Sequence, residues 1–258
     1  METSPFKHPN WAPQTCKGMR LLIVGATGGI GRSLVKMLLS GSDCVLGLHG
    51  NSVAPSWEGE RVIPLRGSLS DESSCNLLVQ SFTAKAGQID GIVVLAGGIR
   101  SNVHWSVIAE QEWEKEIQLH LNVPFYLARA AMRAMKENDR RGRVILTGTE
   151  SALHGGDSNS FPYGIAKRGI ECMVQGLARD GAPNGILVNG VRLGFIASGF
   201  HERWQGKSSK NLAKRVKLVP LQRAGTPEEA AALIAYLLSE WASFMTGQMI
   251  SLSGGDWL

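Results

Sequence analysis

An apolar run ends abruptly in glycines near the start of the chain, in the segment Leu-Leu-Ile-Val-Gly-Ala-Thr-Gly-Gly-Ile-Gly-Arg at 21–32. This order is typical of a buried strand, a tight phosphate-binding loop and the first turn of a helix. Gly25 allows a sharp turn, Gly29 leaves room for a pyrophosphate, and Gly31 lets the helix pack closely. The phosphate would lie on the helix N-terminus, where free N–H groups attract negative charge. Glycine-rich turns of this kind also occur in α/β proteins that bind no nucleotide.

A second motif lies well over a hundred residues further on. Tyr163-Gly-Ile-Ala-Lys167 begins a predicted helix, because apolar residues follow it at helical spacing. The spacing Gly-x-x-x-Gly-x-Gly together with Tyr-x-x-x-Lys resembles the short-chain dehydrogenase/reductase family. The resemblance extends from about Met19 to Gly255 and implies an α/β fold, a single-domain, doubly wound, mainly parallel sheet of the Rossmann type with helices on both faces. The alternation of predicted strands and helices indicates the same class without reference to a family.

Composition favours one globular domain. The chain has 258 residues, of which 43% are hydrophobic and 19% charged, and no apolar run approaches the length of a membrane span. Residues 1–18 are predicted to be an N-terminal extension and 19–258 the dinucleotide-binding domain, with a substrate lobe at about 199–217. The four widely spaced cysteines give no metal-ligand or disulfide pattern, so we expect no metal, small buried cysteine side chains and a cytoplasmic protein.

The remaining elements are predicted from apolar periodicity and cap residues. Strands are expected at Cys44–His49, Arg61–Arg66, Gly91–Ala96, Arg143–Thr147, Ile186–Arg192 and Met245–Leu252. Helices are expected at Ile30–Leu39, from Asp71 to Ala86, at Glu110–Asn138, along the segment that begins at Tyr163, and from Thr226 to Leu238. Pro124 interrupts the longest of these helices and should kink it or be accommodated locally.

The resemblance implies a coenzyme site built from several turns. Its residues are Gly25, Thr27, Gly28, Gly29, Ile30, Gly31 and Ser198 at the phosphates, His49, Gly50 and Asn51 at the ribose, Ser68 and Leu69 at the adenine, and Ala96, Gly97, Gly98, Tyr163, Lys167, Gly194 and Ile196 towards the nicotinamide. Leu48 stands where an acid would bind the ribose hydroxyls. Nothing there repels a 2′-phosphate, and His49 and Asn51 can bind one, so NADP(H) is favoured. Gly28 stands where NADP-selective relatives often place a basic residue, and NAD(H) is not excluded.

The same resemblance implies ketone and alcohol chemistry at Tyr163. A tyrosine with an ordinary pKa near 10 is a poor proton donor unless a cation lowers that pKa, and Lys167 lies on the same helical face. Thr149 stands at the family's serine position and Ser151 follows closely, so either hydroxyl can polarise the substrate carbonyl; Thr149 is preferred. His120 stands at the family's helix asparagine, where it is either a proton-relay residue or a structural histidine.

Three functions are compatible with these motifs. The first is an NAD(P)-dependent carbonyl reductase or alcohol dehydrogenase acting on a small ketone or alcohol. The second is a nucleotide-binding protein that has lost catalysis, because Leu95, His120 and Thr149 replace residues typical of the family. The third is a 3-ketoacyl reductase with an acyl-carrier-linked substrate. Arg133 matches one basic docking residue of those enzymes, but the second position falls near Asn184, so this function ranks below the first.

The substrate lobe is unusually basic. It holds six cations, Arg203, Lys207, Lys210, Lys214, Arg215 and Lys217, against the single acid Glu202. Such charge runs are usually solvated surface; the excess is confined to one short lobe and has no interleaved aromatic apart from Trp204, which argues against nucleic acid. We expect the lobe to attract an anionic substrate, with His201, Arg203 and Trp204 beside it. The resemblance further implies a homotetramer or homodimer built on the helices at Glu110–Asn138 and Tyr163–Gly181.

Overall fold

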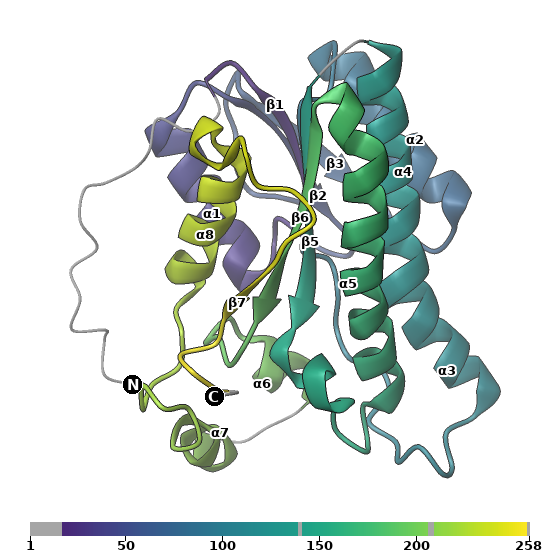
Figure 1. The fold of residues 1–258 in the computed structure, drawn as a ribbon, viewed down its shortest axis with the longest axis vertical. Coiled ribbons are helices and arrows are strands. Elements are labelled where there is room, and N and C mark those ends of the chain that lie inside the picture. Colours follow the sequence, from purple (N-terminus) through teal and green to yellow (C-terminus); the bar gives the residue numbers. More distant parts are fainter. Residues whose placement is uncertain (1–16, 139–140, 206–208, 257–258) are drawn as a thin grey trace.

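The protein is built on one sheet of seven parallel strands in the order β3-β2-β1-β4-β5-β6-β7. The computed structural model describes residues 17–138, 141–205 and 209–256, without the side chains of 203–205 and 209–211. The strands are β1 (Arg20–Val24), β2 (Val45–Gly50), β3 (Val62–Arg66), β4 (Gly91–Val94), β5 (Gly142–Thr149), β6 (Ile186–Leu193) and β7 (Met249–Leu252). This is the predicted doubly wound fold (Figure 1).

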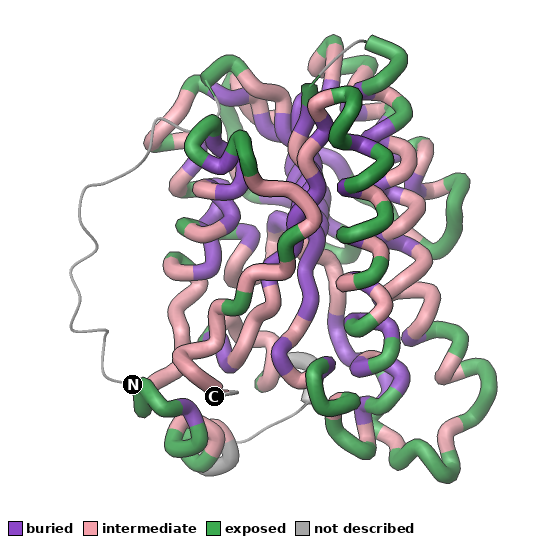
Figure 2. Tube along the Cα trace, in the orientation of Figure 1, coloured by how far each residue is buried: buried purple, intermediate pink, exposed green. Residues whose placement is uncertain are grey.

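Helices cover both faces of the sheet, and the residues of β1 alternate between them. Leu21 and Ile23 pack against the helices α1 (Gly29–Gly41) and α8 (Pro227–Leu238). Leu22 and Val24 pack on the opposite side, against α2 (Glu72–Ala86), α4 (Val123–Glu137) and α5 (Phe161–Gly181). The sheet therefore lies buried between two helical layers, as Figure 2 shows.

The predicted long helix at Glu110–Asn138 is one helical run with a π-helical turn inside it. Its parts are α3 (Glu110–Ile117), the π-turn Gln118–Asn122 and α4. In an uninterrupted α-helix the ring of Pro124 would meet the carbonyl of His120, four residues earlier. The wider turn avoids that clash. The turn also carries His120, which is fully buried, so accommodating the proline fixes where this histidine lies.

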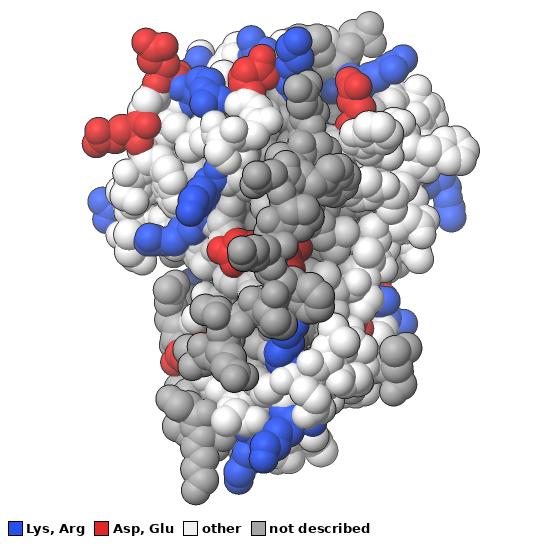
Figure 3. All heavy atoms as spheres, turned by 90° about the vertical axis from the view of Figure 1, so that its left-hand side faces the viewer, with Lys and Arg blue, Asp and Glu red and all other residues white. Residues whose placement is uncertain are grey.

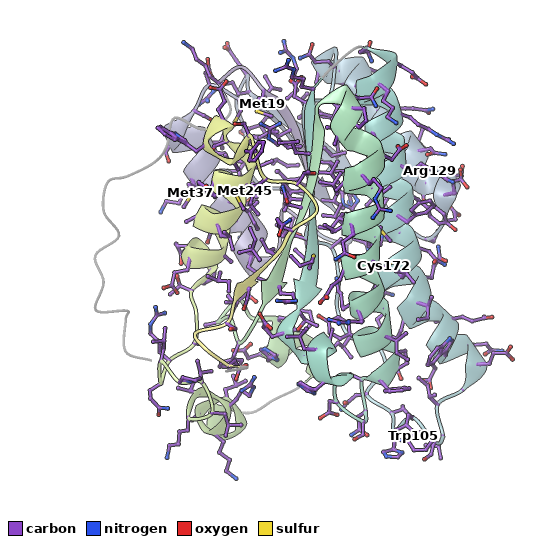
Figure 4. All side chains as sticks on the ribbon, in the orientation of Figure 1. Met19, Met37, Trp105, Arg129, Cys172 and Met245 are labelled. Atoms are coloured by element: carbon purple, nitrogen blue, oxygen red, sulfur yellow. The ribbon has the colours of Figure 1, made fainter. Side chains whose placement is uncertain are left out.

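Three other predictions are corrected. The last strand begins at Met249 and not at Met245, because Gly247 has a positive φ and the preceding segment is a loop. The fourth strand ends at Val94. Cys44 and Cys75 are buried as expected, but Cys172 is exposed on the outer side of α5 (Figure 4). Cys16 lies outside the described residues.

Two predicted helix caps are confirmed. The side chain of Asp71 accepts a hydrogen bond from the Ser74 backbone N–H, and the side chain of Thr226 accepts one from Glu229. The substrate lobe folds into two short helices, α6 (Phe200–Gln205) and α7 (Ser209–Val216). Both lie at the end of the sheet where the strands finish (Figure 1). Among the described residues, no helix is long and apolar enough to cross a membrane.

Candidate active site

A cavity of about 480 Å³ opens at the carboxyl ends of the strands. It lies where the chain, having built β2 and β3 on one side of β1, crosses to β4 on the other. Ligands of open α/β sheets bind at this kind of switch point. The loops after β1 and β4 approach each other closely there, since a Cβ on Gly25 would come within 2.8 Å of the Ala96 backbone nitrogen.

The glycine loop leaves a cradle at the N-terminus of α1. Gly28 is the N-cap and makes no side-chain capping bond, and the first turn of the helix carries no acid. Gly29 leaves no room for a side chain, because a Cβ there would lie 2.5 Å from the carbonyl oxygen of Ser198. The N–H groups at this helix end are therefore left for an anion.

At the end of β2, His49 and not Leu48 faces the cavity. Leu48 is fully buried in the core on the α1 and α8 side, so the expectation that position 48 meets the ribose is wrong. Successive strand residues point to opposite faces, which puts His49 on the other side. His49 is also buried, and its Nε2 lies 2.9 Å from the carbonyl oxygen of Gly67. A carbonyl only accepts, so Nε2 carries the proton and Nδ1 remains for a ligand.

The cavity brings together most of the predicted coenzyme residues. Those that line it are Gly25, Thr27, Gly28, Gly29, Ile30, Gly31, His49, Asn51, Leu69, Ala96, Gly97, Gly98, Gly194, Ile196 and Ser198. Gly50 and Ser68 do not line it: a Cβ on Gly50 would meet the Val53 carbonyl oxygen, and Ser68 is exposed. The predicted catalytic residues Thr149, Tyr163, Lys167 and His120 line the other end.

Tyr163 lies at that end and is half-buried between the rings of His120 and Phe200. Burial raises its pKa to about 12, and a hydrogen bond with the Thr149 side chain acts in the opposite direction. Ser151 does not line the cavity, and its hydroxyl lies 3.2 Å from that of Thr149. In the protein without coenzyme, Tyr163 is therefore a protonated donor and not the tyrosinate that a nearby cation would favour.

Lys167 lies one helical turn after Tyr163 and is almost fully buried. Its Nζ donates to the Thr147 carbonyl oxygen at 2.8 Å and lies 5.9 Å from the centre of the Tyr163 ring. Burial lowers the pKa of Lys167 to about 8. The ammonium form still predominates at pH 7, and only a modest change of environment is needed for it to release a proton.

His120 contacts the Tyr163 ring edge-on, with the ring centres 4.8 Å apart. Its Nε2 lies 3.1 Å from the Gly98 carbonyl oxygen and 3.2 Å from Oε2 of Glu116, a buried carboxylate one turn earlier. Burial lowers the pKa of His120, although Glu116 acts to raise it. The histidine at the predicted relay position thus has an acidic partner.

Known proteins resemble this chain over most of its length. A family model described as Enoyl-(Acyl carrier protein) reductase matches residues 28–256. The 3-oxoacyl-[acyl-carrier-protein] reductase of Salmonella typhimurium is 31% identical over 246 residues, which cover 94% of this chain and 98% of that protein. The Escherichia coli protein of the same name is 30% identical over 248 residues, again covering 94% and 98%. The chain belongs to the short-chain dehydrogenase/reductase family.

The crystal structure of gox2181 has the same fold, with a TM-score of 0.81, 22% identity, and coverage of 94% of this chain and 97% of that one. As a short-chain dehydrogenase/reductase the protein is an oxidoreductase, and its family uses NAD(P)(H). The described residues fit such a coenzyme: the cradle at Gly29 has no space for a side chain, and the N-terminus of α1 lacks a side-chain cap.

The charged side chains described in the cavity wall are all basic. Arg32, Arg100 and Lys167 line the cavity, and no Asp or Glu is found among the described residues of its wall. Arg32 lies beside the glycine loop, where its Nε donates to the Thr27 carbonyl oxygen. An anionic ligand is therefore favoured over a neutral one.

The residues of this short-chain dehydrogenase/reductase site that were not predicted from the sequence include Glu116, Arg32, Arg100 and Phe200. Phe200 lies with its ring centre 6.4 Å from that of Tyr163, which makes the substrate end aromatic. The sequence does contain an indication of Glu116, because an acid four residues before a histidine can pair with it on one face of a helix. That indication alone does not tell a buried pair from a surface pair.

One of the six cations of the substrate lobe is neutralised by an ion pair that the lobe's own sequence does not indicate. Arg215 on α7 makes a bidentate ion pair with Asp256, an acid outside the lobe whose side chain is almost inaccessible, with Nη1 2.9 Å from Oδ1. Figure 3 shows Lys and Arg side chains at the lower end of its face, where α7 lies. His201 lines the cavity, with its ring centre 4.9 Å from that of Phe195. The side chains of Arg203, Trp204 and Lys210, and Lys207 as a whole, are outside the described part.

Proposed function

We propose that this short-chain dehydrogenase/reductase reduces a ketone to a secondary alcohol with NADP(H). When bound, the nicotinamide supplies the hydride. Tyr163 gives its hydroxyl proton to the carbonyl oxygen, Thr149 holds that oxygen with a hydrogen bond, and Lys167 supplies the proton that restores Tyr163. The observation that carries the proposal is the convergence of these three side chains at one end of the cavity. Alcohol oxidation is the same sequence in reverse.

The preference for NADP(H) is supported by the charge of the adenosine end. Arg32 and His49 line it without an acid among its described residues, so a 2′-phosphate meets donors and no repulsion. A ribose with two free hydroxyls would lack the carboxylate that usually binds it. Coenzyme affinities measured by fluorescence should favour NADPH over NADH, and equal affinities would contradict this preference.

Two classes of substrate are candidates: a small free ketone and a carrier-linked 3-oxoacyl group. The relatives at 30–31% identity are named for acyl-carrier-protein-linked substrates. Arg133 is exposed on α4, as a docking residue must be, while Asn184 offers no second cation. The basic lobe and the cations of the cavity support an anionic substrate of either kind.

One experiment separates these functions. NADPH oxidation is followed with a neutral ketone, a 3-oxo carboxylate, a 3-oxoacyl thioester of a short thiol and the same acyl group on acyl carrier protein. We expect turnover with an anionic ketone, and a rate that falls with added salt. A marked gain on the carrier protein, lost in Arg133→Glu, would establish the carrier-linked function. Tight NADPH binding without turnover on any substrate would indicate the catalytically impaired alternative.

A further inference from the structure

Glu116 is a buried carboxylate in the last turn of α3, only 1% exposed. Its Oε1 accepts hydrogen bonds from the backbone N–H groups of Arg100 at 2.6 Å and Ser101 at 2.8 Å. Burial alone acts to raise the pKa of Glu116, but His120 and these two N–H groups hold it below the usual value. The side chain is therefore an ionised acceptor inside the protein, which is costly unless each oxygen has a donor.

The second oxygen of Glu116 acts together with the Gly98 carbonyl oxygen on the tautomer of His120. Nε2 of His120 lies between Glu116 Oε2 and the Gly98 carbonyl oxygen, and both of these atoms only accept. A proton on Nε2 is donated to the Gly98 carbonyl oxygen and lies beside the negative charge of Glu116 Oε2, whereas a lone pair there would face two other lone pairs. We propose that Glu116 is a positioning residue that keeps the proton of His120 on Nε2, so that Nδ1 is the proton acceptor in the catalytic wall of the cavity.

Nδ1 is placed where such an acceptor is useful. It is buried without a hydrogen-bond partner among the described residues. A Cβ on Gly97 would lie 3.4 Å from Nδ1 and 3.2 Å from Cε1, so this edge of the ring faces a residue that lines the cavity. The titratable groups around the ring are Glu116 from α3 and Tyr163 and Lys167 from α5; Lys167 acts on it through its charge.

The assignment extends the proposed function and rests on it for its kinetic consequence. Each reduction consumes one hydride and one proton, and the proton leaves from Tyr163. Lys167 returns a proton to the phenolate of Tyr163. His120 then relays a proton from solvent through Nδ1, so that Tyr163 and Lys167 are protonated again. A ring with the proton on Nδ1 and a lone pair on Nε2 could not accept there, because its only lone pair would face Glu116 and Gly98.

The test uses Glu116→Gln, which keeps the size of the side chain. The amide oxygen can still accept from Arg100 and Ser101, but the amide NH₂ then faces Nε2 of His120 and should move its proton to Nδ1. Nitrogen NMR of the coenzyme-free protein should report Nε2–H in the wild type and Nδ1–H in the variant. We expect kcat to fall about 100-fold, the lower end for loss of an acid–base group, with the KM for coenzyme changed less than threefold.

Two controls make the result specific. Glu114→Gln alters an exposed acid on the same helix and should change neither the NMR signal nor kcat. In a His120→Asn background, Glu116→Gln should cause no further loss of kcat, because its effect passes through the histidine. A wild-type His120 that carries its proton on Nδ1 would overturn the proposal without any variant. So would an equal loss of kcat in the His120→Asn background. The NMR result stands even if no ketone is turned over.

Discussion

Tyr163 is the residue on which the proposed chemistry depends most directly. With its pKa raised to about 12 by burial, it keeps its proton in the coenzyme-free protein at neutral pH. Tyr163→Phe removes this proton and little else, so kcat should fall by at least about 100-fold. NADPH affinity, measured by fluorescence titration, should stay within a few-fold of the wild type. A variant that kept more than about a hundredth of the wild-type kcat would exclude Tyr163 as the acid.

His49 should make coenzyme choice depend on pH. Burial lowers its pKa, against the bond to Gly67, so the ring of the free protein is neutral near pH 7. Neutral Nδ1 accepts from a hydroxyl but must gain a proton to donate to a 2′-phosphate. A bound phosphate dianion raises the pKa of His49, so NADPH binding takes up a proton and weakens as pH rises through the raised pKa.

Calorimetry in buffers of different ionisation enthalpy measures that uptake. We expect proton uptake at pH 7 with NADPH and none with NADH, and no uptake with either coenzyme in His49→Asn. Equal uptake for the two coenzymes would show that His49 does not sense the 2′-phosphate. The unfolding free energy depends on pH in the opposite direction: the lowered pKa of His49 means that the unfolded chain binds more protons there, so stability falls as pH falls below about 6.5.

Some residues of the site can be predicted from the sequence and others cannot. The glycines, Tyr163 and Lys167 are recognisable because their spacing is fixed by a turn and by one helical turn. Leu48 was misplaced by one residue, and in a strand one residue exchanges the two faces. Glu116 could not be assigned because its partners, the backbone N–H groups of Arg100 and Ser101, come from a loop whose path the sequence does not specify.

At the scale of elements, the loop between β1 and α1 offers a matched pair of substitutions. A Cβ on Gly29 would lie 2.5 Å from the Ser198 carbonyl oxygen, whereas a Cβ on Gly28 would make only an ordinary 3.5 Å contact with Gly25. Gly29→Ala should therefore lower the melting temperature by several degrees, from a cost of about 1–3 kcal/mol. Gly28→Ala should leave it nearly unchanged, and scanning calorimetry of the free proteins compares them. Equal melting temperatures for the two variants would contradict the close approach.

The helix from Glu110 to Glu137 shows how far periodicity can predict an element. Its apolar stripe indicated the full length, and Pro124 marked where it would deviate. A proline can be accommodated by a kink, a break or a wider turn, and only packing against α5 and the loop after β4 selects among them. The π-helical turn orients the ring of His120 towards that of Tyr163.

At the scale of the whole molecule, we predict a homotetramer or homodimer built on α4 and α5. The outer face of α5 exposes Phe161 and Ile165, at 36% and 38% of their surface, although the helix packs on the sheet with its other side. Burying this face in a second copy removes apolar surface from water. Light scattering at micromolar concentration should give at least twice the monomer mass, and Ile165→Glu should lower it. A monomeric wild type would exclude the assembly.

The overall fold was predictable because its determinants are local and repeated. Each β-strand ends at a turn signal, each long helix shows an apolar stripe, and Asp71 and Thr226 mark their caps. The conformation of the lobe after β6 was not predicted, since its helices α6 and α7 are short and its sequence is strongly basic. The pairing of Arg215 with Asp256 joins segments that only the completed fold brings together.

The contact between Gly29 and Ser198 also bears on how the protein matures. One wall of the coenzyme cradle comes from the first loop of the sheet and the other from the segment after its sixth strand. A nascent or truncated chain that lacks the second wall has the glycine motif but no closed cradle. Such contacts between distant segments form late, because closing a long loop costs entropy before it brings any gain. Acquisition of coenzyme affinity should therefore mark the end of folding, and a cell's supply of coenzyme would favour finished chains over incomplete ones.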